Sequence, residues 1–177
     1  MKFKITFVLV SLVLLTACSP ENEDYIDNNS SNLIIEIGGG TTPDPTSSSY
    51  QTDLMAGQHI YSGIVNVEVV DDNVVVSYTS ENDWEIVETH LYVGDLNQLP
   101  TTGSGNPKIG HFPYKDNHPA GTVNVEYVGP EISEGECVYV AAHAVVINTV
   151  TGDEETAWGA GVPIGGNSWA MTFEYCY

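Results

Sequence analysis

Three of the five histidines, together with one glutamate, are the first candidates in this sequence for metal or acid–base chemistry. Glu88 and His90 lie in one β-branched run, His143 lies in a second such run, and His111 lies in a proline-containing stretch between them. Imidazole and carboxylate groups together bind zinc and other transition metals. Their spacing is not a recognised ligand motif, so His90, His111 and His143 are metal candidates beside the alternative of hydrogen-bonded structural histidines.

Oxygen ligands gather at two turns, which makes calcium the other cation to consider. Asp71-Asp72-Asn73 forms one group and Asp153-Glu154-Glu155 forms the second. Carboxylate and amide oxygens are the ligands that hard cations prefer, but neither turn has the spacing of an EF-hand loop. We therefore predict no cofactor, with calcium as the alternative to solvated hairpin tips.

Motifs for covalent or phosphate chemistry are missing from the sequence. It contains no G-x-S-x-G elbow, no H-E-x-x-H pair and no Walker loop. Paired carboxylates for glycoside hydrolysis stay open, because their separation is spatial and the chain has 24 acidic residues. We predict a protein that is not an enzyme; the alternative is a metal-dependent or carboxylate-based hydrolase of extracellular polymers.

The charge balance excludes one class of partner. The chain has four lysines, no arginine and 24 acidic residues, for a formal net charge of −20. A surface of this kind cannot neutralise a phosphate backbone, so nucleic acid is not a partner. Apolar residues make up 42% of the chain, which is the composition of a folding domain and not of a disordered acidic tail.

The first 18 residues resemble a bacterial lipoprotein signal. Two lysines precede an apolar run at residues 7–15, and Leu15-Thr16-Ala17-Cys18 is similar to the lipobox that the lipoprotein signal peptidase cuts. We predict that residues 1–17 are removed and that acyl chains on Cys18 anchor the protein in the outer membrane. The acidic residues at 21–24 resemble a surface-export signal, which predicts a lipid-anchored, surface-exposed protein.

A flexible tether is predicted to follow the anchor. Residues 18–52 are rich in Asn, Ser, Gly, Thr and Pro, which is linker composition. The folded domain is predicted over residues 53–177, which hold 18 of the 24 acidic residues. The acidic charge therefore belongs mainly to the domain.

Hydrophobic residues in the domain alternate with period two. This pattern, with Gly, Asp, Asn and Pro at the turns, predicts an all-β fold. We expect an antiparallel β-sandwich of about seven to eight strands with one long loop at about 95–121. The strands expected from the sequence lie at residues 64–69, 74–79, 84–93, 122–128, 137–150 and 169–177.

Alternation also assigns faces and pairs the cysteines. The core face is predicted to carry Val87, Thr89, Leu91 and Val93 on one strand, and the even positions 138–146 and odd positions 169–175 on two others. Cys137 and Cys176 then share the opposite face. Two cysteines remaining in an exported protein predict one disulfide, with free buried thiols as the alternative.

The long loop is the predicted site of function. It contains Ile109, His111, Phe112 and Tyr114, which is too apolar for a free linker, so it should fold over a sheet face. A packed Ω-loop that covers apolar surface is the alternative to a binding loop. The candidate ligand-binding residues, from this loop and the strands beside it, are His111, Phe112, Tyr114, His90, Glu88, Tyr92, His143 and Trp158.

Five blocks of sequence carry a wider resemblance. They are ETHLYVG at 88–94, GHFPY at 110–114, YVAAHAVV at 139–146, ETAWG at 155–159 and SWAMTF at 168–173. In this order they resemble an extracellular β-sandwich module of Bacteroidota-type surface lipoproteins. The resemblance implies location and fold and no catalytic residue. We therefore expect a binding or adhesion module for an extracellular glycan or protein, with a purely structural envelope protein as a further alternative.

Overall fold

The computed structural model describes residues 49–177. The predicted signal peptide (1–17), the acylated Cys18 and the tether up to residue 48 lie outside the described residues and stay predictions. Across residues 49–177, none of the helices has the length and apolarity to cross a membrane. The described chain consists of strands, loops and two one-turn 3₁₀-helices.

The described chain is all-β and antiparallel, as the period-two pattern predicts. It has ten strands, because strands at 49–56, 114–117, 154–159 and 162–163 add to those expected. The elements are β1 (Ser49–Ala56), β2 (Ile60–Val70), β3 (Asn73–Ser80), β4 (Trp84–Gly94), η1 (Leu96–Gln98), η2 (Ile109–His111), β5 (Tyr114–Asn117), β6 (Asn124–Glu131), β7 (Cys137–Asn148), β8 (Glu154–Gly159), β9 (Val162–Pro163) and β10 (Met171–Cys176).

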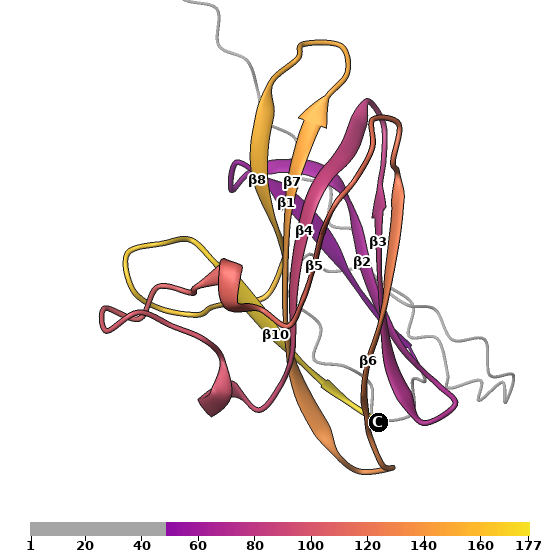
Figure 1. The fold of residues 1–177 in the computed structure, drawn as a ribbon, viewed down its shortest axis with the longest axis vertical. Helices are drawn as coiled ribbons and strands as arrows, with labels where there is room; N and C mark the ends of the chain where they lie inside the picture. The colour runs from indigo at the N-terminus through magenta and orange to yellow at the C-terminus, as the bar shows by residue number, and fades with distance from the viewer. Residues whose placement is uncertain (1–48) are drawn as a thin grey trace, which may run out of the picture. The chain divides into compact units, whose positions relative to one another are not determined.

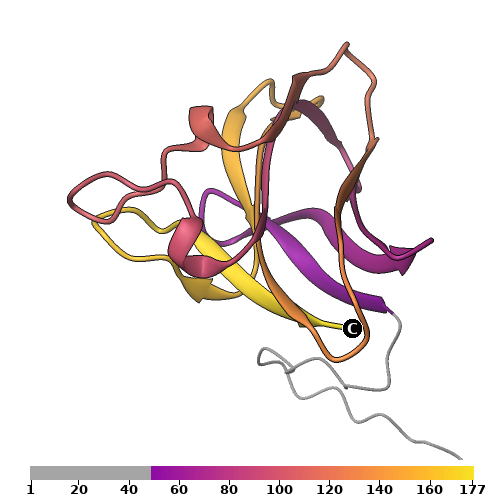
Figure 2. The same ribbon diagram turned by 60° about the horizontal axis from the view of Figure 1, so that its bottom comes forward.

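The strands form one curled, hydrogen-bonded sheet. Their order is β5-β4-β7-β8-β1-β2-β3-β6, and β10 pairs with both β7 and β9. Strand β1 joins the two halves, because it pairs with β2 along its length while Leu54–Ala56 also pairs with β8. The two halves face each other around a cluster of buried apolar residues that we call the main core; it includes Leu54 on β1, Val65 on β2, Tyr78 on β3 and Val140 on β7. The sheet is therefore nearly barrel-shaped (Figures 1 and 2).

Strand β1 starts earlier than the sequence pattern suggests. Residues 49–52, which we placed in the tether, pair with β2 from Ser49 opposite Glu68 onward. Tyr50 packs its ring 5.0 Å from that of Phe173, and Thr52 donates a hydrogen bond to the Ala160 carbonyl. The serine-rich sequence does not indicate this strand, because its residues are buried by contacts with residues far away in the sequence.

Strand β7 confirms the predicted alternation. Val140, Ala142, Ala144 and Val146 have no exposed surface and lie in the main core. On one edge β7 pairs with β4, and on the other it pairs with β8 and then β10. This strand is therefore central to one half of the sheet.

Strand β4 departs from the predicted alternation. Its register against β7 shifts between Ile86 and Glu88, so Val87 is the extra residue of a β-bulge. Side chains at positions 84 and 86 enter the main core before the bulge, and those at 91 and 93 do so after it. The predicted core face is wrong at Val87, because a bulge moves the alternation by one residue.

A tyrosine on β6 bridges the two ends of the curled sheet. The Tyr127 hydroxyl lies 2.6 Å from Thr89 Oγ1 on β4. Its ring lies 6.0 Å from that of Tyr114 on β5 and 6.4 Å from that of Tyr78 on β3. Side chains of Tyr127 and its neighbours thus link β6 with β4 and β5.

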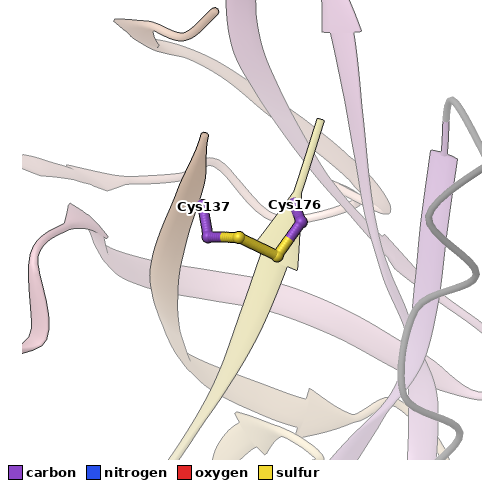
Figure 3. The surroundings of a disulfide bond; sticks show 2 residues. All are labelled: Cys137 and Cys176. Carbon is purple, nitrogen blue, oxygen red and sulfur yellow. A yellow bond between two sulfur atoms is a disulfide. The ribbon is translucent and has the colours of Figure 1, made fainter. Parts of the chain in front are cut away.

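The predicted disulfide is present. Cys137 and Cys176 are directly paired residues of β7 and β10, with a Cα–Cα distance of 4.0 Å and an S–S distance of 2.06 Å (Figure 3). Beyond them the Tyr177 backbone N–H donates to the Glu136 carbonyl. The bond therefore fixes the last strand of the chain to the central strand β7.

Replacing both cysteines by alanine should lower the free energy of unfolding by roughly 4 kcal/mol, because the bond closes a loop of about 40 residues in the unfolded chain. Urea denaturation of wild type and Cys137→Ala/Cys176→Ala checks this. Reduced wild type serves as the control and should lose the same amount. An unchanged unfolding midpoint in the double variant would show that the bond adds no stability.

Candidate functional site

A second apolar cluster lies on the outer face of the β4–β7–β8 sheet. We call it the outer cluster; its buried members are Tyr92, Leu99, Phe112, Ala141, Trp158 and Ala170, with Ile109, Ile164, Trp169 and Met171 packed around them. Small side chains at Ala141 and Ala170 let the loops approach the sheet closely. The predicted folding of the long loop over a sheet face is therefore confirmed.

Two loops together cover this face. They are residues 96–113, which include η1 and η2, and residues 160–170, which connect β8 to β10 through β9. Both loops extend to the same side of the sheet (Figures 1 and 2). We call them the loop pair.

Burial removes several predicted binding residues from the surface. Phe112 is 1% exposed, Trp158 5% and Tyr92 6%. The Tyr92 and Phe112 rings lie 5.9 Å apart, and the Tyr92 hydroxyl donates to the Asp95 carbonyl at 2.5 Å. These three aromatic residues hold the loop on the sheet and offer no ring face to a ligand.

The other two loop candidates lie apart from each other. His111 is exposed at the end of η2, and Tyr114 is half-buried on β5 against Tyr127. The predicted surface formed by His111, Phe112 and Tyr114 is therefore not assembled, because Phe112 is buried and Tyr114 packs against Tyr127.

An asparagine joins the two loops. Asn106 Oδ1 accepts hydrogen bonds from the backbone N–H groups of Asn167, at 2.7 Å, and Ser168, at 3.1 Å. Gly166 adopts φ 73°, and an added Cβ there would collide with the Asn106 side chain and backbone. Gly166 and Asn106 thus allow the two loops to pack closely against each other.

The loop pair is free of carboxylates. No Asp or Glu occurs in residues 96–113 or 160–170, although residues 53–177 hold 18 acidic residues. Its charged side chain is Lys108, and Lys115, the other lysine of residues 49–177, follows closely. The loop pair is therefore a nearly neutral surface on an acidic domain.

The tip of the loop pair presents hydroxyl and amide groups beside a tryptophan. Ser104, Asn167 and Ser168 are exposed, and Trp169 is partly exposed at the rim of the outer cluster. The Ser104 hydroxyl lies 2.9 Å from that of Thr102. Sequence reasoning assigned Trp169 to the core face and missed this surface, although the two carboxylate-free stretches are visible in the sequence.

The structure brings Glu88, His90 and His143 together on the same face. His143 Nδ1 lies 3.4 Å from His90 Nδ1, and His90 Nε2 lies 3.3 Å from Glu88 Oε1. The His143 ring also packs against that of Trp158, with centroids 4.8 Å apart. With both rings neutral, these contacts are satisfied when His90 donates to Glu88 and His143 donates to His90.

Burial keeps both rings in the neutral form. Desolvation, and then the neighbouring His90, lower the pKa of His143 from 6.5 to about 3. Desolvation also lowers the pKa of His90; Glu88 opposes this shift and Lys115 adds to it. The pair is thus a hydrogen-bonded structural element at neutral pH.

The predicted three-histidine site is not assembled. His111 lies in the loop, whereas His90 and His143 face each other on β4 and β7. Among residues 49–177 no three His, Cys, Asp or Glu side chains are grouped so that they could hold a metal ion. The acidic turns at 71–73 and 153–155 form no such group either.

A cavity of about 380 Å³ lies at the end of the sheet where β4 bulges. Its lining comes from residues 85–87 of β4, residues 118–120, and residues 147–149 and 152 around the end of β7. Glu85 at this cavity accepts a hydrogen bond from the Gly121 N–H, and His118 lies 2.8 Å from Thr89 Oγ1. Both polar side chains are therefore engaged with the protein itself.

Comparison with protein-family models, curated proteins and solved structures finds no match to this chain. The resemblance of the five sequence blocks to a surface-lipoprotein module accordingly stays a prediction.

A packing role for the loop predicts unequal effects at two neighbouring residues. Phe112→Ala should lower the free energy of unfolding by about 3–5 kcal/mol, because it empties a buried site. His111→Ala, at an exposed site, should change it by less than about 0.5 kcal/mol. Denaturant unfolding of both variants checks this, and equal small effects would contradict the packing role.

The buried histidines predict acid sensitivity. Because the pKa of His143 is lowered, the unfolded chain binds a proton that the native chain lacks once the pH falls below about 6.5. Stability is then lost as the pH falls toward 3, by up to about 1.4 kcal/mol per pH unit, and the lowered pKa of His90 acts in the same direction.

Unfolding measured between about pH 7 and pH 5 tests this above the usual range of the carboxylates. The variant His143→Gln removes one titrating ring and should show a shallower dependence on pH. Identical slopes in the variant and wild type would contradict the role assigned to His143.

Proposed function

We propose that this protein is a surface-exposed lipoprotein of the bacterial outer membrane whose β domain is a non-catalytic binding or adhesion module. The lipobox-like residues 15–18, followed by acidic residues and a linker composition, support the anchor and its location. The Cys137–Cys176 disulfide suits an oxidising extracytoplasmic compartment. The ligand proposed at this level is an extracellular glycan or protein.

One observation carries the binding role. No carboxylate occurs in either loop of the loop pair, and both loops rest on an apolar cluster of their own. Binding residues are often carried on loops that a rigid scaffold positions. This nearly neutral loop surface is suited to contact with another molecule. The strongly acidic surface of the rest of the domain is less suited to such a contact.

The hydrolase alternative has weaker support. The histidines that it would use are 6% and 3% exposed at His90 and His143, and they are engaged with each other and with Glu88. A general acid or base must reach the reacting group of a substrate. The observed pair instead stabilises the contact between β4 and β7.

The anchor is tested by labelling bacteria that express the full chain with radioactive palmitate. Wild type should take up label and fractionate with the outer membrane, and protease added to intact cells should digest it. Cys18→Ala should lose the label, because the acylated thiol is gone. Ser19→Ala, next to it in the sequence, is the matched control and should keep the label.

Label that persists in Cys18→Ala would overturn the lipoprotein assignment. Labelled wild type that resists protease until the cells are broken would place the protein on an internal leaflet.

A further inference from the structure

We infer that the loop pair binds a neutral, hydroxyl-rich polysaccharide through Trp169 and the polar groups at its tip. This inference rests on the proposed function of a binding module and names the class of its ligand.

The loop pair differs in charge from the rest of the domain. Residues 53–177 carry 18 acidic residues, and the loop pair, 96–113 with 160–170, carries none of them. A cationic partner would be drawn to the acidic remainder of the domain and away from Lys108. A polyanion would be repelled by the domain as a whole. An uncharged ligand meets neither effect, so the surface without carboxylates fits it best.

The tip of the loop pair carries hydrogen-bonding side chains. Exposed at the tip are the hydroxyls of Ser104 and Ser168 and the amide of Asn167. Within residues 49–177, no hydrogen bond engages the side chains of Asn167 and Ser168, so these groups face solvent unpaired. Amides and hydroxyls both donate and accept, which matches the hydroxyls of a sugar.

A tryptophan lies beside these polar groups. Trp169 follows these residues directly and packs at the edge of the outer cluster while staying partly exposed. A partly exposed aromatic ring next to polar groups can serve as an apolar platform for a ligand. The C–H face of a pyranose ring pairs with such a platform while its hydroxyls reach the amide and hydroxyl groups.

Hydrogen bonds and close packing connect the two loops of the loop pair. The bonds from Asn167 and Ser168 to Asn106, and the close approach at Gly166, hold the two loops in one arrangement before any ligand arrives. The outer cluster supports them from below. A preformed surface loses less conformational entropy on binding, which matters for weak contacts with single sugar units.

The test is affinity electrophoresis of the full wild-type chain, extracted from the membrane in a non-ionic detergent. Native gels contain dextran, mannan or laminarin as neutral probes, or alginate as an acidic probe. Wild type should be retarded in at least one neutral gel and not in alginate. Calorimetry with that neutral polysaccharide should give a Kd that changes less than about twofold between about 50 and 500 mM NaCl, because no charge on the ligand is screened.

Three variants locate the site. Trp169→Ala should weaken binding about tenfold or more, as expected when a central aromatic contact is removed. Asn167→Ala should weaken it less, and it keeps the fold because its backbone N–H still reaches Asn106. Tyr61→Ala is the matched control, because Tyr61 is a partly exposed aromatic on β2, outside the loop pair, and should bind as wild type does.

The outcomes separate the ligand class from the general role. No retardation in any neutral gel, or retardation by alginate alone, overturns the polysaccharide inference. Palmitate labelling and surface exposure of the wild-type chain would still support the proposed lipoprotein. Wild-type affinity in Asn167→Ala and in a folded Trp169→Ala also overturns it. If Trp169→Ala does not fold, Asn167→Ala decides.

Discussion

Strand β7 is buried on both faces, and the arrangement of the domain depends on that. Its inward residues Val140, Ala142, Ala144 and Val146 fill the main core, while its outward residues Ala141 and His143 lie under or beside the outer cluster. An antiparallel strand usually leaves one face in water. Here the outward face is largely apolar, so residues 96–113 and 160–170 must cover it. These loops adopt a defined structure because they pack on that face.

The sequence predicted what depends on local pattern. Asp71 and Asp72 form the loop between β2 and β3. Both lie in the left-handed region, with φ 49° and φ 62°, as expected for a polar two-residue hairpin loop. The alternation along β7 and the shared face of Cys137 and Cys176 were equally legible. Three features were not. The bulge at Val87 has no composition signal, β1 hides in a serine-rich stretch, and β5, β8 and β9 are too short to establish a period.

The sequence pointed to the long loop as the candidate site, but most of the individual residues that it suggested are buried. Phe112, Tyr92 and Trp158 are aromatic, and sequence type alone does not distinguish a ring that binds a ligand from one that anchors a loop. Trp169 was assigned to the core because its odd position continues the alternation of Phe173 and Tyr175, but it lies at the edge of the outer cluster. Two carboxylate-free stretches were visible in the sequence, but their adjacency depends on Asn106 reaching residues more than sixty positions away.

The buried histidine pair and the neutral loop pair follow from one electrostatic limit. Residues 49–177 have two lysines to balance their acidic groups, so a charge placed under the loops would find little compensation. His90 and His143 meet this limit by staying neutral and bonding to each other, with Glu88 at the more open end of the pair. The loops meet it by excluding carboxylates above Trp158 and Phe112. The same exclusion that lets the loops pack on an apolar cluster leaves their outer surface uncharged, so stability of the loop pair and its suitability for an uncharged ligand have one physical origin.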